Sequence, residues 1–264
     1  MASAPKPGLP VCYNELVPLN TQMHAKWRAR TVDKAPWVAK QHVVPLTVEE
    51  FPLAQRDFPI VFSSGDNPVP LAVMGLNENV NTFFEADGTP IGIFYVPAYI
   101  RRFPFLLVKA RPQDENLSLC FDPSAGLLGE FEDGQTLFND DATATEHTKE
   151  LLNFCEKFEE AGLRTKAFMD ELQALGLLTD GEVAINRAQN DGQPFIYRGF
   201  KMVDENKLRE LRGDQLRKMN ENGMLPLIYA HLFSLDQLRL IFAKADEQGE
   251  GPPAVAPVPA NASA

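Results

Sequence analysis

The residues best suited to bind a ligand lie between Tyr95 and Phe105, in the run Tyr-Val-Pro-Ala-Tyr-Ile-Arg-Arg-Phe-Pro-Phe. Arg101 and Arg102 stand there within the most aromatic stretch of the chain. A guanidinium group stacks on aromatic rings and pairs bidentately with carboxylates. One interpretation is therefore an anion pocket that uses the two arginines and is walled by Tyr95, Tyr99 and Phe103.

A second interpretation is that these arginines serve the fold, with Arg101 or Arg102 tied to an internal acid. The candidate acids are Asp122, Glu85 and Asp87. Under this interpretation Arg102→Ala destabilises the protein, because it leaves a buried charge without its partner. Under the first interpretation the variant keeps its melting temperature and loses the ligand. The sequence leaves both interpretations open.

No other stretch carries a recognisable catalytic or metal-binding motif. The histidines His24, His42, His147 and His231 form neither HxH nor HExxH, and the chain has no GxSxG, P-loop or GxGxxG pattern. His231 lies in an apolar run, which is typical of a hydrogen-bonded core histidine. Paired acids such as Glu49-Glu50 are typical of helix starts, where they face the macrodipole. The sequence thus indicates no metal site and no cofactor, favours a non-catalytic protein, and leaves the enzyme question open.

Composition narrows the partners and the compartment. The net charge of −11 disfavours binding to nucleic acid, since phosphate backbones repel an acidic chain. The basic residues near Trp27–Lys40 are interpreted as part of a solvent-exposed surface. Cys12, Cys120 and Cys155 match no zinc spacing and suit a reducing compartment.

No apolar stretch reaches the ~20 residues of a spanning helix, and the N-terminus does not resemble a signal peptide. We expect no integral membrane insertion and a cytoplasmic protein, with non-classical export to the surface left open.

Proline divides the chain into a strand-rich and a helix-rich half. Residues 1–123 contain 15 of the 21 prolines, and residues 124–251 contain only two. Proline disrupts helix interiors and central strands, so short strands and turns are expected in the first half. The expected strands are Phe58–Ser63, Pro70–Gly75, a hairpin of Asn81–Glu85 and Ile91–Val96 around Asp87-Gly88, Phe105–Lys109 and Leu117–Phe121. Short connections favour antiparallel pairing.

A long amphipathic helix is expected from Thr145. Apolar and small residues recur there at steps of three and four, from Leu151 to Gly176. It is either one helix or two that meet near Gly162. This stripe favours packing within the chain, and a homodimer through the 145–176 helix is the alternative.

The residues after this helix predict strands inserted between helices. We expect a polar loop at Gly181–Gln193, a strand at Phe200–Val203, and short helices capped by Asp204 and Asp214. An apolar strand at Leu225–Phe233 and a helix capped by Ser234 at Leu235–Ala245 follow.

The fold class is therefore α+β, with an N-terminal antiparallel β-rich region packed against C-terminal helices that interleave with one or two further strands. The expected division is a flexible N-terminus at 1–14, a single domain at 15–245 (β-rich over 40–123, helix-rich over 140–245) and a disordered Pro/Ala tail at 246–264.

Several of these segments together resemble the bacterial SapC-like family. The resemblance rests on Phe58–Ser63, Pro70–Leu76, the Asn81–Gly88 turn, Tyr95–Phe105 and the stretches Gly199–Asp204 and Tyr229–Leu235, and it extends over residues 15–245. The family takes its name from a surface-layer gene cluster, and the resemblance supplies no catalytic residues.

Three functional hypotheses follow from the residues and the resemblance. The first is an accessory protein that binds another protein of a cell-envelope, surface-layer or nutrient-uptake system. The second is an enzyme or enzyme partner that holds a small anionic substrate at Tyr95–Phe105, with Asp122 as an internal acid of that site. The third is a self-assembling surface-layer component.

Overall fold

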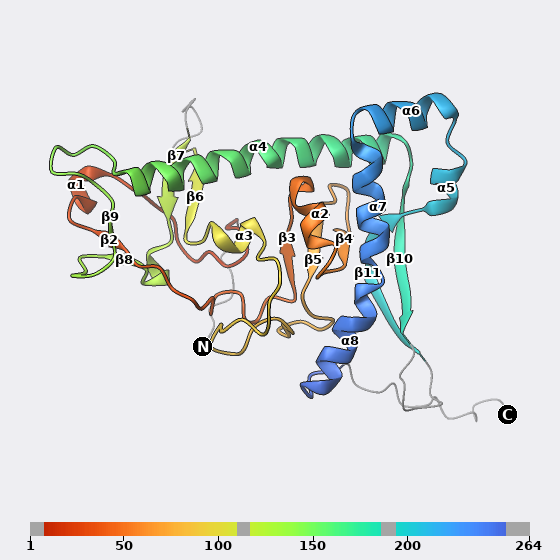
Figure 1. The fold of residues 1–264 in the computed structure, drawn as a ribbon, viewed down its shortest axis with the longest axis horizontal. Coiled ribbons are helices and arrows are strands. Elements are labelled where there is room, and N and C mark those ends of the chain that lie inside the picture. The colour runs from red at the N-terminus through yellow and green to blue at the C-terminus, as the bar shows by residue number, and fades with distance from the viewer. Residues whose placement is uncertain (1–7, 110–116, 186–193, 252–264) are drawn as a thin grey trace.

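The structure, a computed structural model, describes residues 8–109, 117–185 and 194–251 of the 264-residue chain. It combines antiparallel sheets with helices that are mostly C-terminal, which confirms the α+β prediction. Figure 1 shows an elongated molecule in which the longest helix, α4 (Glu146–Ala174), lies across one end of two separate groups of strands.

The larger sheet has five antiparallel strands in the order β10-β11-β4-β5-β3. Their bounds are β3 (Val43–Pro45), β4 (Ile60–Ser63), β5 (Pro70–Val73), β10 (Leu178–Ile185) and β11 (Phe195–Val203). β11 joins the two halves of the chain, since Phe200 pairs with Ser63 and Lys201 with Phe62. Two C-terminal strands thus complete a sheet that the N-terminal half begins. The sequence predicted the end of β11, at Phe200–Val203, but it did not predict β10.

The second group of strands lies under the first half of α4 (Figure 1). It contains a sheet in the order β1-β7-β6 and a set of two-residue strands in the order β8-β2-β9. The bounds are β1 (Val17–Pro18), β2 (Arg28–Ala29), β6 (Phe105–Val108), β7 (Ser118–Phe121), β8 (Leu128–Gly129) and β9 (Gln135–Thr136). Phe105, Leu107 and Phe121 form a core there with Cys155 of α4.

The remaining helices are short, apart from three in the C-terminal third. Their bounds are α1 (Thr21–His24), the 3-10 turn η1 (Val48–Glu50), α2 (Phe51–Ala54), α3 (Ala98–Arg101), the 3-10 turn η2 (Pro123–Ala125), α5 (Glu205–Arg209), α6 (Gly213–Glu221), α7 (Met224–Ser234) and α8 (Gln237–Glu247). Asp204 caps α5 as predicted, because its carboxylate accepts from the amides of Asn206 and Lys207. Asp214 does not cap α6; it lies in the first turn and pairs with Arg212.

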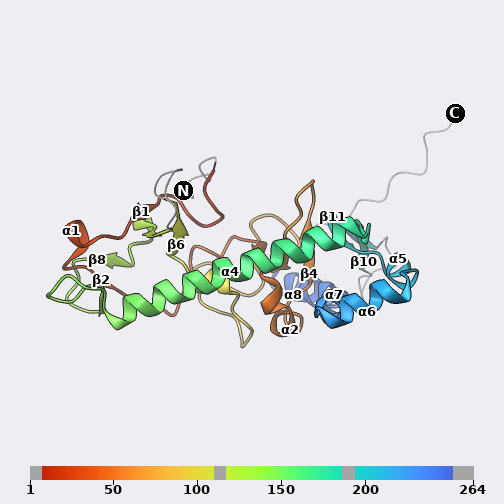
Figure 2. The same cartoon turned by 90° about the horizontal axis from the view of Figure 1, so that it is seen from above.

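α4 is one continuous helix that passes through Gly162 without a break. Figure 2 looks down onto it and shows that it runs from the β2 and β8 end of the molecule to the α6 end. Its predicted stripe packs within the chain, with Cys155, Thr165, Met169 and Leu172 buried. A homodimer through this helix remains a prediction, and it would have to use the outer face.

Two segments differ from the predicted strands because contacts distant in sequence decide their conformation. Residues 81–96 form the turn at Asp87-Gly88 but no strands, only an isolated bridge between Phe84 and Pro90. The Asn81 side chain instead binds the backbone oxygens of Val38 and Gln41, and such bonds compete with a strand ladder. The apolar run Leu225–Phe233 is helical within α7, since a short apolar run does not distinguish a strand from a buried helix.

Two smaller expectations need correction. The predicted polar loop at Gly181–Gln193 begins inside β10, where Gly181 pairs with Phe200, and residues 186–193 lie outside the described part. Ser234 ends α7 rather than capping the next helix. Its hydroxyl accepts from the Ile60 amide at 2.8 Å and donates to the His231 oxygen at 2.6 Å.

Ordered packing extends past both predicted domain limits. Tyr13 is buried, and its hydroxyl donates to the Phe105 oxygen at 2.7 Å. α8 continues to Glu247. Residues 1–7 of the predicted flexible N-terminus and 252–264 of the predicted tail lie outside the described part.

His231 of α7 is the core histidine that its apolar surroundings predicted. It is fully buried, and the Val203 amide donates to its Nε2 at 3.1 Å. Nδ1 therefore carries the proton and donates to the Ile60 oxygen at 2.7 Å. The neutral ring thus bridges α7 to β4 and β11. Burial lowers the pKa of His231 to about 4, although the hydrogen bond to Ile60 acts in the opposite direction.

We predict that the protein loses stability as the pH falls from about 6.5 to about 4. The folded-state pKa of His231 lies below its unfolded value, so the unfolded chain binds the extra proton in this window. The stabilising effect of the neutral ring is present above the window and is lost on acidification, by about 3 kcal/mol. Urea unfolding across this pH range measures the loss.

The pKa values of His24 and His42 are also lowered by burial and act in the same direction. A variant comparison isolates the contribution of His231. His231→Gln should flatten the pH dependence relative to wild type. Equal pH dependence in wild type and His231→Gln would contradict the assignment to His231.

Candidate functional site

The Tyr95–Phe105 segment is held by a buried carboxylate, that of Glu50. Glu50 ends η1 and is 5% exposed. Its Oε1 accepts from the Ala98 amide at 2.6 Å and from the Tyr95 hydroxyl at 3.0 Å. Its Oε2 accepts from the amide and the hydroxyl of Thr47, both at 2.9 Å. Four donors thus surround one carboxylate, which satisfies a buried charge.

Glu50 also supplies the N-terminal cap of α3. Pro97 precedes this helix and offers no side chain that could bind its first amides. The Ala98 amide is bound instead by Glu50, from a different element. The Tyr95 amide is held in a similar way by Asp57, at 2.9 Å. The entry into α3 is therefore fixed by acids of the η1–α2 region.

Arg102 is a buried structural residue. It is 6% exposed, and its Nη1 lies 3.4 Å from Oε1 of Glu159 on α4. The guanidinium carbon lies 4.2 Å from the ring centroid of Phe158 and 4.6 Å from that of Tyr99. Burial raises the pKa of Glu159, and Arg102 offsets part of that rise. Arg102 therefore connects α3 to the middle of α4 by charge and by stacking.

The acids predicted to pair with an arginine have other partners. Asp122 is buried, and its carboxylate accepts from the amides of Asn14 at 2.6 Å and Ser124 at 2.8 Å. Asp87 forms an ion pair with Lys34, and this hydrogen-bonded cation lowers the pKa of Asp87. Glu85 is exposed and has no ion pair among the described residues. The acid that pairs with Arg102 is Glu159, so that part of the prediction was wrong.

Arg101 has the opposite environment. It is exposed, although its position is fixed: Nε donates to the Val96 oxygen at 3.0 Å and Nη2 to the Tyr95 hydroxyl at 3.2 Å. No carboxylate pairs with it in the described part of the chain. The predicted site residues therefore divide into two groups. Arg102, Tyr99 and Asp122 belong to the interior, whereas Arg101 and Phe103 line a cleft of about 370 Å³, and Tyr95 orients Arg101.

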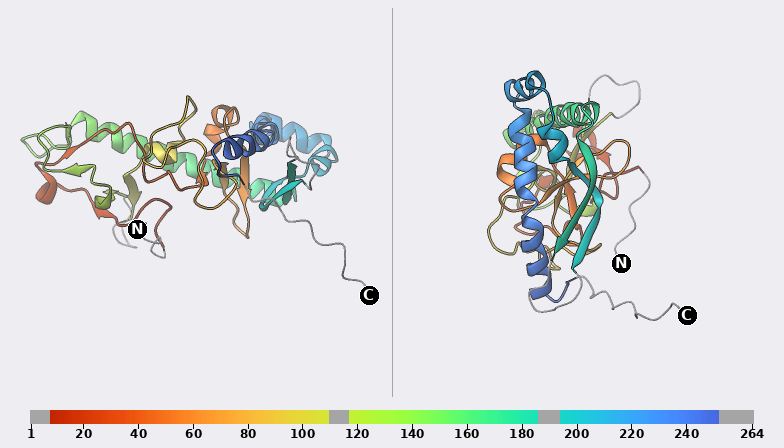
Figure 3. Two further views of the ribbon diagram at one scale, coloured as in Figure 1. Left: turned by 90° about the horizontal axis from the view of Figure 1, so that it is seen from below. Right: turned by 90° about the vertical axis from the view of Figure 1, so that its right-hand side faces the viewer.

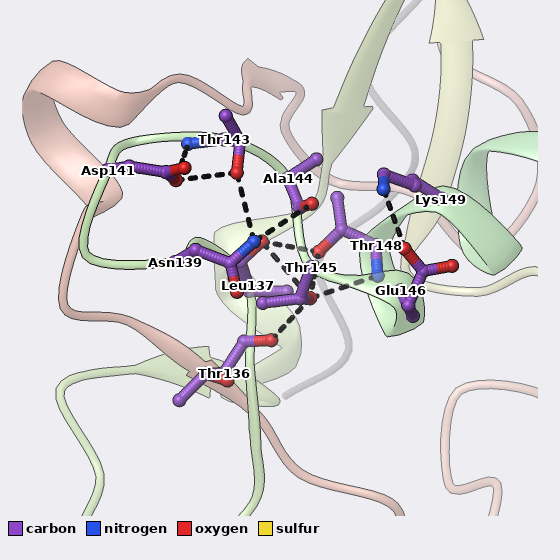
Figure 4. Close-up of polar contacts among 10 residues, drawn as sticks. All are labelled: Thr136, Leu137, Asn139, Asp141, Thr143, Ala144, Thr145, Glu146, Thr148 and Lys149. Carbon is purple, nitrogen blue, oxygen red and sulfur yellow. Dashed lines mark hydrogen bonds and ion pairs between the residues drawn. The ribbon is translucent and has the colours of Figure 1, made fainter.

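The first turn of α4 brings further side chains to this cleft. Thr145 caps the helix: its hydroxyl accepts from the Thr148 amide at 3.3 Å and donates to the Thr136 oxygen at 2.8 Å (Figure 4). Thr148 adds a hydrogen bond to the Leu137 oxygen at 2.7 Å (Figure 4). This network fixes the start of α4, where His147 and Leu151 line the cleft.

The thiols near Arg102 do not provide a nucleophile at neutral pH. Burial raises the pKa of Cys12 to about 12 and that of Cys155 to about 11, and the attraction of Arg102 for the thiolates lowers both only in part. Reactive cysteines require the opposite shift. The described residues also contain no group of three or more His, Cys, Asp or Glu side chains placed to hold a metal ion.

A family model described as SapC matches residues 19–240. The chain belongs to the SapC family. No curated protein and no solved structure matches it. Within the described part of this SapC chain, each helix is too short or too polar to cross a membrane.

Sequence reasoning missed Glu50, Glu159, Trp37 and His147. Glu50 carries a usable signal, because Thr47-Val-Glu-Glu50 matches the capping-box pattern. Glu159 directly follows Phe158 of the predicted helical stripe. Trp37 and His147 carry no signal, since only the fold brings residues this far apart in sequence into one cleft.

We predict that Arg102→Ala destabilises the protein by about 2–4 kcal/mol, because it removes the stacking on Phe158 and Tyr99 and leaves Glu159 without its partner. Arg101→Ala is the matched control in the adjacent position. It should cost less than about 1 kcal/mol, since Arg101 is exposed. Urea unfolding of both variants measures the difference. Equal losses in the two variants would contradict the division of the arginines into a buried and an exposed one.

Proposed function

We propose that the protein is a non-catalytic accessory protein of a cell-envelope, surface-layer or nutrient-uptake system. It binds a partner protein through the α7 ridge, which we define as Pro226, Tyr229 and Phe233 of α7 together with Leu240 of α8. The exposure of the two ridge aromatics is the observation that carries the proposal: Tyr229 is 43% exposed and Phe233 68%. Membership of a family named for a surface-layer gene cluster supports the setting.

α7 is apolar around its whole circumference, with the sequence Met-Leu-Pro-Leu-Ile-Tyr-Ala-His-Leu-Phe-Ser. Its inner face packs on the five-stranded sheet and buries Met224, Ile228 and His231. A helix of this composition is ordinarily covered on all sides. An apolar face that remains exposed is typical of an interaction surface.

The ridge continues from α7 into α8. Pro226, Tyr229 and Phe233 are spaced by three and four residues, which places them on one side of the helix. The rings of Tyr229 and Phe233 lie 5.7 Å apart. Leu235 and Asp236 keep helical backbone angles between the two helices, so Leu240 extends the same side. Figure 3 shows α8 continuing α7 along the outside of the molecule.

The charges beside the ridge indicate the chemistry of the partner. Arg239 directly precedes Leu240 in α8. The helix α2 packs against α7 and exposes Leu53, and Arg56 donates a hydrogen bond to the backbone oxygen of Leu53. Both arginines are exposed and lack an ion pair within the described part of the chain. Asp236, between the helices, and Glu247, at the end of α8, are exposed acids of the same two helices. Arginine beside exposed aromatic residues suits a partner surface that combines apolar side chains with carboxylates.

The test is quantitative capture from the native host with three forms of the tagged full chain. We expect one partner to bind wild type and Leu163→Asp, a control on the exposed outer face of α4, and to bind Phe233→Asp at least about tenfold more weakly. Light scattering of the same samples measures self-association.

Two results would overturn this proposal. The first is equal capture by all three forms, which would place any binding elsewhere on the surface. The second is a self-assembled wild type that Phe233→Asp converts to monomer, which would favour the surface-layer component instead.

A further inference from the structure

The cleft beside α3 has the features of a small-ligand site that is separate from the α7 ridge. We call it the Arg101 cleft; it lies between the segment 29–37, the region from α3 to β6, and the first two turns of α4. Its volume of about 370 Å³ lies within the range of small-molecule sites. Trp37, Ile100, Phe103 and Leu151 are among its apolar walls.

Arg101 is an oriented cation that no carboxylate of the described residues neutralises. Its Nε and Nη2 are bound to the Val96 oxygen and the Tyr95 hydroxyl, and its guanidinium carbon lies 5.3 Å from the centroid of the Phe154 ring. Tyr95 is anchored in turn by Glu50. Nη1 has no partner among the described residues, so a fixed donor remains available to a ligand.

The charge that lines the cleft is opposite in sign to that of the whole chain. Among the lining residues, the cations Arg30, Lys34 and Arg101 outnumber the acid Asp33. Arg30 pairs with Asp133 and Lys34 with Asp87, which leaves Arg101 as the lining arginine without an ion pair in the described residues. In a chain of net charge −11, such a cleft is the kind of place where an anion binds.

Trp37 supplies an unsatisfied donor and a flat wall. Its ring stacks on Phe103 with centroids 4.5 Å apart and an interplanar angle of 24°. Its indole Nε1 is buried and has no hydrogen-bond partner in the described part of the chain. Buried donors are nearly always paired, so an orphan beside a cleft calls for an explanation. A ligand that brings an acceptor into the cleft provides one.

We propose that the Arg101 cleft binds a small carboxylate with a flat apolar body. The guanidinium of Arg101 holds the carboxylate through charge and hydrogen bonds. One carboxylate oxygen accepts from the indole Nε1 of Trp37, and Phe103 contacts the apolar body. The planar fork of arginine matches a carboxylate, and the aromatic walls exclude water from the pair. This site is independent of the α7 ridge, so either proposal stands if the other fails.

The test uses tryptophan fluorescence, since the chain has only Trp27 and Trp37. In a Trp27→Phe background, Trp37 reports on the cleft alone. Benzoate is the probe, benzamide its neutral analogue, and inorganic phosphate the probe for charge without an apolar body. We expect benzoate to change the Trp37 emission saturably, with a dissociation constant of about 1 mM or tighter, and benzamide to bind at least about tenfold more weakly.

Variants assign the site to Arg101. Arg101→Gln should weaken benzoate binding at least about tenfold, and Arg101→Lys should be intermediate, because it keeps the charge without the fork. Arg164→Gln is the matched control; Arg164 is exposed on α4 and pairs with Glu49. Equal melting temperatures of the variants exclude a folding effect.

Three outcomes would overturn this assignment. They are the absence of a saturable change with benzoate, equal binding of benzoate and benzamide, and unchanged benzoate affinity in Arg101→Gln. Binding of phosphate without binding of benzoate would also overturn it, because the apolar body would then play no part.

Discussion

The candidate site depends on one buried carboxylate, that of Glu50. It receives four hydrogen bonds, two from Thr47 and two from the Tyr95–Phe105 segment. The Val48 amide of the same turn donates to the Thr165 hydroxyl of α4 at 3.0 Å, so η1 is itself held by the long helix. The Glu50 side chain therefore connects α3 and Tyr95 to η1, and through η1 to α4. Without it, the orientation of Arg101 loses its support, because Tyr95 would be free to move.

α3 gives two consecutive arginines opposite roles. Adjacent residues of a helix point about 100° apart, and this rotation is enough to place Arg102 in the interior and Arg101 at the surface. Arg102 stabilises the junction of α3 with Phe158 and Glu159, which keeps the helix in position. Arg101 is then available as a charged group of fixed direction beside Phe103 and Trp37. One face of this short aromatic segment, with Arg102, therefore packs against α4, and the other face, with Arg101, is available to bind a ligand.

The sequence predicted features that local chemistry decides. The α+β class, the strands near Phe58–Ser63 and Pro70–Gly75, and the start of α4 at Thr145 followed from apolar patterns and a capping residue. The prediction from sequence was wrong where contacts between residues far apart in the chain determine the secondary structure. The run Leu225–Phe233, predicted as a strand, is helical and packs on β4 and β11. For the site, the sequence indicated the segment but neither the division of its arginines nor Glu159. Trp37, Arg101 and His147 lie far apart in sequence, and no spacing rule could join them.

Hydrogen exchange at the Ala98 amide tests the role of Glu50 most directly. In Glu50→Gln this amide should lose its protection, and the free energy of unfolding should fall by about 2–3 kcal/mol, because a neutral amide cannot accept from all four donors. The neighbouring Glu49→Gln removes only an exposed ion pair with Arg164 and should leave the Ala98 amide protected. Protection of Ala98 that is the same in both variants would contradict the claim that Glu50 organises the site.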